Sequence, residues 1–182
     1  MPSCATTIPA NAFNGCSQIT SFDLTQATSL QSAGAGFLKN TPNLVEVKGL
    51  ANLPGGVIPN EAFKGSGIGS ISIPKQIVRI DSGAFEGSEL TTLTFEGGRS
   101  SDLAIKNHAF KGTAELGQEL VLPATTTELG EFAFEGSGIT AVRAEAGFKL
   151  TNIGIGVFHL TMKLKTATLP PSIESIGGAA FE

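Results

Sequence analysis

The chain has 182 residues, of which 41% are hydrophobic and 15% are charged, with a net charge of −4. It is too apolar to be disordered, and its 12 Lys and Arg residues against 16 Asp and Glu residues give no basic surface for nucleic acid. No apolar run reaches the roughly 18 residues of a membrane span, so direct membrane insertion is not expected. All 12 aromatic residues are Phe, whose rings carry no polar group and suit buried positions.

A repeat of about 24 residues runs through the chain. Its first element is a tight turn of the form Ala-Phe-x-Gly, with an aliphatic residue five positions before the Phe. The second copy departs from this pattern at Ser32 and Lys39, and the seventh has Leu160 in place of Gly, so both coils are expected to be irregular. The Phe residues of these turns are predicted to stack as the structural core of the repeats: Phe13, Phe37, Phe63, Phe85, Phe110, Phe134, Phe158 and Phe181.

The second element of each repeat is a short strand with apolar residues at its first, fourth and sixth positions. Its copies occupy residues 19–24, 44–47, 68–73, 90–95, 116–122, 139–144 and 164–169. One unit cannot bury its apolar side alone, so neighbouring units must stack into a continuous core. We therefore predict one β-rich solenoid of the α/β repeat type over residues 1–182. It should have seven to eight units, tight turns or short 3₁₀ pieces, and little regular α-helix.

Some residues fall outside this repeat. Insertions at residues 52–56 and 97–102 are either harmless bulges or loops on a binding face. Phe22 and Phe95 occupy core positions of the strands, whereas Phe132 and Phe148 have no core position in this alignment of repeats. The last two rings are therefore the aromatic residues to inspect for an exposed contact.

The strand and turn together resemble a known family. A Leu-x-x-Leu-x-Leu strand joined to Ile-x-x-x-Ala-Phe-x-Gly-Cys/Ser is similar to the BspA-like, or Treponema pallidum-type, leucine-rich repeat, most closely at residues 80–88 and 8–16. Cys16 matches the family's Cys, at a small position expected to be buried, where other copies have Ser66, Ser88, Thr113 and Ser137. The resemblance implies a right-handed leucine-rich-repeat superhelix, and proteins that are typically secreted or surface-anchored and often act as adhesins.

Residue patterns typical of catalysis, metal binding or cofactor binding are absent from the sequence. There is no Gly-Lys dipeptide for a phosphate loop, no nucleophile elbow and no paired-His zinc motif. His108 lies at a tolerant turn position and His159 at a column of mostly charged residues, so neither indicates a metal site. We predict no enzyme, no cofactor and no metal. Cys4 and Cys16 could form one local disulfide or none.

The outward side chains of the strands form the candidate ligand-binding surface. In leucine-rich repeats this surface usually binds ligands, although short hydroxyl residues are also ordinary strand formers. Of the residue types enriched at binding hot spots, the surface has only Arg143. The predicted ligand-binding residues are Asp23, Glu46, Lys48, Ser70, Ser72, Thr92, Thr94, Glu119, Arg143, Thr166 and Thr168.

Two functions are consistent with these features. The first is an extracellular or cell-surface adhesion module that binds a protein or glycan through the strand-lined face. The second is a structural spacer that projects other domains and has no ligand of its own. Neither end carries a polar capping repeat, so we expect a segment of a longer array or end-to-end self-association. The segment Met1–Cys4 does not resemble a signal peptide, so the extracellular location is implied by the resemblance alone.

Overall fold

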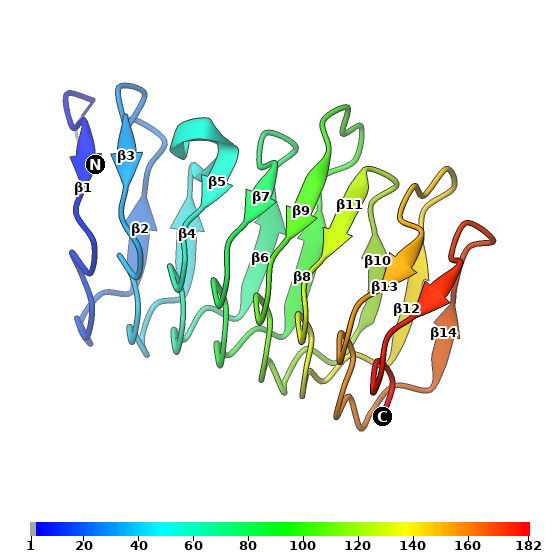
Figure 1. Ribbon diagram of the computed structural model, residues 1–182. Coiled ribbons are helices and arrows are strands. Elements are labelled where there is room, and N and C mark those ends of the chain that lie inside the picture. Colours follow the sequence, from blue (N-terminus) through cyan, green and yellow to red (C-terminus); the bar gives the residue numbers. More distant parts are fainter. Residues whose placement is uncertain (1–2) are drawn as a thin grey trace.

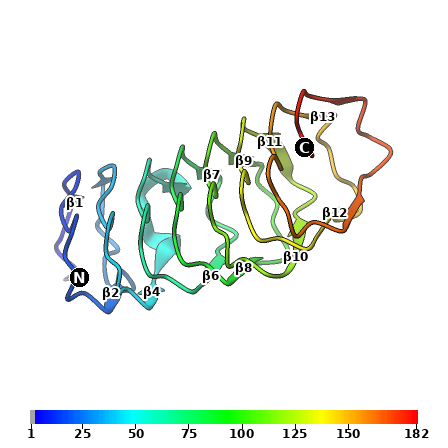
Figure 2. The ribbon, with the colours of Figure 1, turned by 90° about the horizontal axis from the view of Figure 1, so that it is seen from below.

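Each repeat forms one coil, and successive coils stack side by side along the molecule (Figure 1). This computed structural model describes residues 3–182. Within that part of the chain the only helical elements are two 3₁₀ segments, η1 (Leu50–Asn52) and η2 (Pro54–Gly56). Figure 2 shows the same coils from below, with the two ends of the chain at opposite ends of the stack. The fold is therefore the predicted β-rich solenoid.

Two sets of short parallel strands line two sides of the coils. The first set forms the strand-lined face: β2 (Ser21–Asp23), β4 (Glu46–Lys48), β6 (Ser70–Ile73), β8 (Thr92–Phe95), β10 (Glu119–Leu122), β12 (Ala141–Ala144) and β14 (Thr166–Thr168). The second set forms what we call the second face: β1 (Thr7–Ile8), β3 (Ser32–Ala33), β5 (Val57–Ile58), β7 (Arg79–Ile80), β9 (Leu103–Ile105), β11 (Thr126–Leu129), β13 (Asn152–Ile153) and β15 (Ser175–Ile176). Every pair of bonded strands is parallel, because each strand pairs with its counterpart in a neighbouring coil.

A column of Phe rings runs through the interior of the stack. From Phe63 to Phe158 the five rings are fully buried, with neighbouring centroids 5.0 to 5.6 Å apart and interplanar angles of 14° or less. The ring of Phe22 joins the column, since it lies 5.2 Å from Phe13 and 5.8 Å from Phe37. At the two ends, Phe13 is only half-buried and Phe181 is 37% exposed. Nine of the 12 Phe residues therefore lie in this column.

The second coil differs by one residue from the predicted alignment of repeats. In regular coils the N–H of the turn Phe donates to the carbonyl of the residue before the next turn Phe, as Phe85 does to Ala109. Phe13 N–H donates instead to Phe37 O, and Leu38 N–H donates to Ala62 O. Leu38 thus holds the backbone position of the turn Phe, while the Phe37 ring still fills the buried column. The prediction that Phe37 occupies the repeat position is wrong by one residue.

This shift removes most of the expected irregularity of the second coil. Ala33, and not Ser32, pairs with Ile8 in the strand column, and Asn40, not Lys39, holds the position of the turn Gly with φ of 53°. The seventh coil keeps the same conformation, with Leu160 at φ of 55°. The expected irregularity is therefore wrong for the backbone of both turns, because each adopts the left-handed conformation without Gly. The second coil does differ from the others in the residue that supplies its buried ring.

A column of hydroxyl residues lies beside the Phe column. Thr41, Ser88, Thr113 and Thr161 each donate to the carbonyl three residues earlier, at 2.6 to 2.8 Å. These residues are buried, and the bond satisfies their one polar group inside the core. Cys16 holds the equivalent place in the first coil but is exposed, so its predicted burial is wrong: no described coil covers that side of the first turn. Cys16 and Cys4 are both free thiols.

Both insertions are tied to neighbouring coils by polar side chains. Asn52 donates to the carbonyls of Leu24 and Thr25, at 2.8 and 3.1 Å. Arg99 donates to the carbonyls of Pro74, at 2.9 Å, and Ile77. These bonds satisfy turn carbonyls of an earlier coil, which gives both insertions a structural role.

Candidate functional site: the strand-lined face

The predicted outward residues of the strands align in two columns along the strand-lined face. Ser70 pairs with Thr92, and Ser72 pairs with Thr94. The same register continues at both ends, where Asp23 pairs with Lys48 and Arg143 pairs with Thr168. The structure therefore brings the predicted residues onto one surface, because side chains two apart in a strand point to the same side. All of them are exposed except Thr92, which is half-buried.

Charges on this face are partly neutralised by one another. Lys48 Nζ lies 3.1 Å from Glu46 Oε2, and Arg143 Nε lies 3.2 Å from Glu119 Oε1. The side chains in both pairs are about half exposed, so the pairs contribute little to stability. Hydrogen bonds from Thr25 lower the pKa of the Asp23 carboxyl. Arg143, the only predicted hot-spot residue, is thus already engaged by Glu119.

Hydrogen bonding along the face is not continuous. The strands form three bonded groups, β2-β4, β6-β8 and β10-β12-β14. At the second break the side chain of Gln118 takes the place of a backbone partner: its Nε2 donates to Leu93 O at 2.6 Å, and Leu93 N–H donates to its Oε1 at 3.4 Å. The strand-lined face is therefore interrupted between β8 and β10, which the repeat pattern did not predict.

A groove of about 200 Å³ lies at this break. Its lining residues are Leu93, Thr94, Phe95, Gln118, Glu119, Val121 and Glu145. Phe95 was predicted as a strand-core residue, and it is only half-buried. An aromatic residue thus lines a groove on the strand-lined face, where the sequence predicted no aromatic residue. The larger size of Phe95 relative to the aliphatic residues of its column is the signal that could have indicated it.

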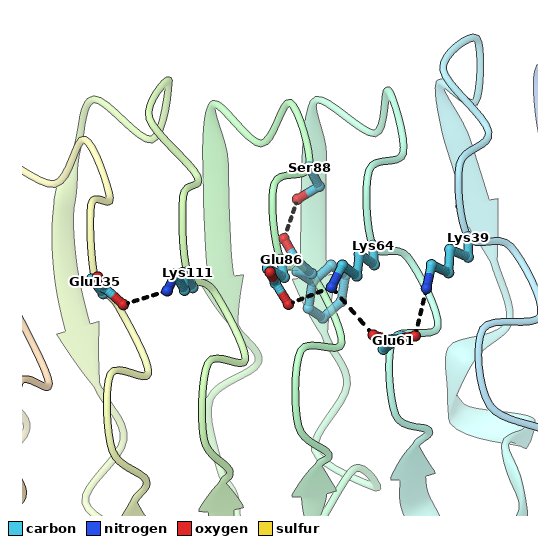
Figure 3. Close-up of polar contacts among 8 residues, drawn as sticks. Lys39, Glu61, Lys64, Glu86, Ser88, Lys111 and Glu135 are labelled. Carbon is cyan, nitrogen blue, oxygen red and sulfur yellow. Dashed lines mark hydrogen bonds and ion pairs between the residues drawn. The ribbon is translucent and has the colours of Figure 1, made fainter.

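The turn edge of the coils carries the expected mixture of charges as a ladder of ion pairs (Figure 3). Glu61 lies 2.7 Å from Lys39 and 3.2 Å from Lys64, and Lys64 lies 2.9 Å from Glu86. The hydrogen bond that Lys39 donates lowers the pKa of the Glu61 carboxyl. The hydrogen bond that Lys64 donates to the Glu86 carboxylate raises the pKa of the Lys64 ammonium. Because these charges pair with each other, this edge has little free charge for a ligand.

The same edge holds both histidines and one of the two unassigned Phe rings. The rings of His108 and Phe132 are stacked with centroids 5.6 Å apart, and the ring of His159 lies 6.2 Å from Phe132. Phe132 is half-buried, whereas Phe148 is 7% exposed and belongs to the core. His159 Nδ1 also lies 3.7 Å from Glu135, which Lys111 contacts at 2.8 Å. The hydrogen bond from Lys111 lowers the pKa of the Glu135 carboxyl.

Residues 3–182, which the structure describes, also bear on metal and membrane sites. No group of three or more His, Cys, Asp or Glu side chains in this range is placed to hold a metal ion. The same residues include no helix with the length and hydropathy needed to cross a membrane.

Comparison with known proteins identifies the family. A family model described as the BspA type leucine rich repeat region matches residues 1–55 and 56–182, in six copies. The chain is similar to the crystal structure of the pneumococcal vaccine antigen PcpA, with 18% identity, a TM-score of 0.61 and coverage of 97% of this chain and 53% of that one. It is also similar to the Treponema pallidum leucine-rich repeat protein TpLRR, with 19% identity, a TM-score of 0.54 and coverage of 95% and 67%.

The comparisons concern the fold of the chain and the share of each similar structure that it covers. The chain spans about half the length of the PcpA structure and about two thirds of the TpLRR structure. No curated protein matches it significantly. At such low identities the two structures support the fold alone. Since the family model covers the whole chain, the chain belongs to the BspA-type leucine-rich repeat family.

Proposed function

We propose that this chain is an interaction or adhesion module that binds a protein ligand through its strand-lined face. The observation that carries the proposal is the alignment of exposed side chains across seven strands in two columns. An extended surface of this kind can contact a macromolecule at many points. The turn edge is less suited to this role, because its charges are paired within the chain. Leucine-rich repeat families are typically non-enzymatic, and we propose no catalytic activity or cofactor here.

The proposed location is extracellular or at a cell surface. Two features support it: members of this family are often secreted or surface proteins, and one similar structure is that of a vaccine antigen. A moderate affinity is expected for the chain alone, because the face has few of the Trp, Tyr and Arg residues that dominate binding energies. Several copies presented together would bind far more tightly through avidity.

A pair of matched double variants tests this proposal. Ser72→Arg with Thr168→Arg places two bulky charges on the strand-lined face, at positions that are exposed and outside the groove. Ser175→Arg with Thr127→Arg makes the same two changes at exposed positions of the second face. Both proteins and the wild type are screened by surface plasmon resonance against purified extracellular-matrix proteins and a glycan array.

The expected result is binding of a matrix protein by the wild type and by the second-face variant, with at least tenfold weaker binding by the strand-face variant. Equal binding by the two variants would exclude the strand-lined face as the site. Binding to glycans alone would replace the protein ligand by a carbohydrate. Absence of binding by the wild type to every probe would favour a spacer without a ligand.

A further inference from the structure

The groove between β8 and β10 has a chemistry that the rest of the strand-lined face does not share. The face elsewhere is built mainly of short hydroxyl side chains and paired charges. Here Phe95 and Val121, both half-buried, contribute apolar lining, while the backbone of the buried Leu93 and the side chain of Gln118 form the bonds that bridge the two strands. A partner side chain entering the groove would therefore meet a partly apolar surface.

Two carboxylates also line this groove, Glu119 and Glu145. Glu119 Oε1 pairs with Arg143, and Glu145 Oε2 accepts a hydrogen bond from Ala124 N–H at 3.0 Å. A carboxylate can accept about four hydrogen bonds, so both retain capacity for a further donor. Within the described part of the chain, none of the residues that line the groove is Lys, Arg or His. Arg143 and Arg99 lie outside the lining, where Arg143 pairs with Glu119 and Arg99 interacts electrostatically with Glu145. The lining itself carries two carboxylates and no cation, which makes it complementary to a positive charge.

An apolar lining with carboxylates matches one kind of protein side chain. Lys and Arg have long apolar stems that pack on hydrophobic surface, with the charged group at the end. Hydrogen bonds between such a cation and a carboxylate are stronger than neutral ones. The volume of about 200 Å³ is sufficient for one such side chain.

We propose that this groove receives a single lysine or arginine side chain of the protein ligand. The inference rests on the proposed function of the strand-lined face and specifies which chemistry of the partner it recognises. The stem packs against Phe95 and Val121, and the cationic group donates to Glu119 and Glu145. Gln118 holds the two strands at the spacing that forms the groove.

The groove can be tested without knowing the ligand, by using small probes of the side chain. N-acetyl-lysine methylamide and N-acetyl-arginine methylamide are titrated into ¹⁵N-labelled protein, with N-acetyl-norleucine methylamide as the uncharged analogue of similar length. We expect saturable amide shifts confined to Leu93, Gln118, Val121 and their neighbours for the two cations, which weaken in high salt. The uncharged analogue should bind more weakly.

Charge-neutral variants identify the carboxylates involved. Glu119→Gln and Glu145→Gln preserve size, and each should weaken cation binding about two- to fivefold, because these pairs are partly exposed. Glu128→Gln, which removes a carboxylate from the second face, is the matched control and should leave binding unchanged. Circular dichroism spectra confirm that each variant is folded.

The possible results separate this inference from the proposed function. The proposed cation site is refuted if neither cation shifts the amide signals of the groove residues, or if the uncharged analogue shifts them equally. Effects of Glu128→Gln as large as those of Glu119→Gln would also overturn it, since a general charge effect would then explain binding. If the groove binds the cations while no matrix protein binds the strand-lined face, the groove stands and the proposed function fails. If a protein binds the face but the cations do not shift the groove, only the groove fails.

Discussion

Removing one ring from the middle of the Phe column should cost much more stability than removing one from its end. Phe110 has no exposed surface and stacks on Phe85 and Phe134, with centroids 5.1 and 5.0 Å away. Phe181 is 37% exposed and has one ring neighbour, Phe158, at 5.2 Å. The two positions share the same repeat turn, so they form a matched pair.

The magnitude follows from burial and stacking. Truncation of a buried Phe to Ala costs about 3–5 kcal/mol, and each aromatic pair contributes about 0.5–1.5 kcal/mol beyond its burial. Phe110→Ala loses two such pairs and leaves a cavity on both sides, so we expect a loss near the upper end, about 4–5 kcal/mol. Phe181→Ala loses one pair and less buried area, which gives about 1–2 kcal/mol. Phe110→Leu keeps most of the volume and should cost about 1–2 kcal/mol.

Urea unfolding followed by far-ultraviolet circular dichroism measures these differences. The chain has no Trp or Tyr, so the usual intrinsic fluorescence probes are missing. The slope of each transition must be compared as well, because a repeat protein can lose cooperativity when one interface is weakened. Equal losses for Phe110→Ala and Phe181→Ala, at equal slopes, would refute the view that stacking of neighbouring coils supplies the stability.

Four further outcomes are expected from single substitutions. Leu160→Gly should stabilise the protein by about 1 kcal/mol, because Leu160 holds a left-handed backbone with φ of 55°. Gly87→Ala should destabilise it by a similar amount, because Gly87 has φ of 62°, and the added methyl group meets no neighbouring atom that would add a clash. Thermal melts measure both changes. Glu135→Gln should reduce the loss of stability in acid. The hydrogen bond from Lys111 lowers the pKa of the Glu135 carboxyl in the folded state, so the ionised carboxyl stabilises the fold above pH 4.5, and this contribution is lost as the pH falls below that value. The Gln variant has no such contribution to lose. Gln118→Leu should cost about 1–3 kcal/mol by leaving backbone groups of β8 unpaired, and faster amide exchange in β8 would show it.

Much of the architecture could be predicted from the spacing of residues alone. The recurrence of Phe and of the strand pattern implies stacked coils, because no single coil can bury its own apolar residues. The outward columns also follow, since alternation along a strand is a local property, and Ser72 does lie beside Thr94. Every repeat contributes to these features in the same way, so several copies of the pattern support the same prediction.

Features that depend on one particular contact between coils could not be read in this way. Gly36, Phe37 and Leu38 are compatible with two alignments of the second repeat, and only the hydrogen bonds to the neighbouring coils select between them. The bond between Gln118 and Leu93 joins residues 25 apart and has no counterpart in the repeat pattern. The groove beside Phe95 lies at that contact, and the repeat pattern did not predict it either.

The sequence by itself determined that this chain is a stack of Phe-cored coils with a polar strand face, because both properties repeat with a fixed period. The tertiary structure decided where that regularity is broken. In the second coil, Leu38 holds the backbone position of the turn Phe while Phe37 supplies the buried ring. Between β8 and β10, the side chain of Gln118 replaces a backbone partner. A periodic pattern specifies what all coils share, whereas a site that differs from its neighbours arises from contacts that only one pair of coils makes.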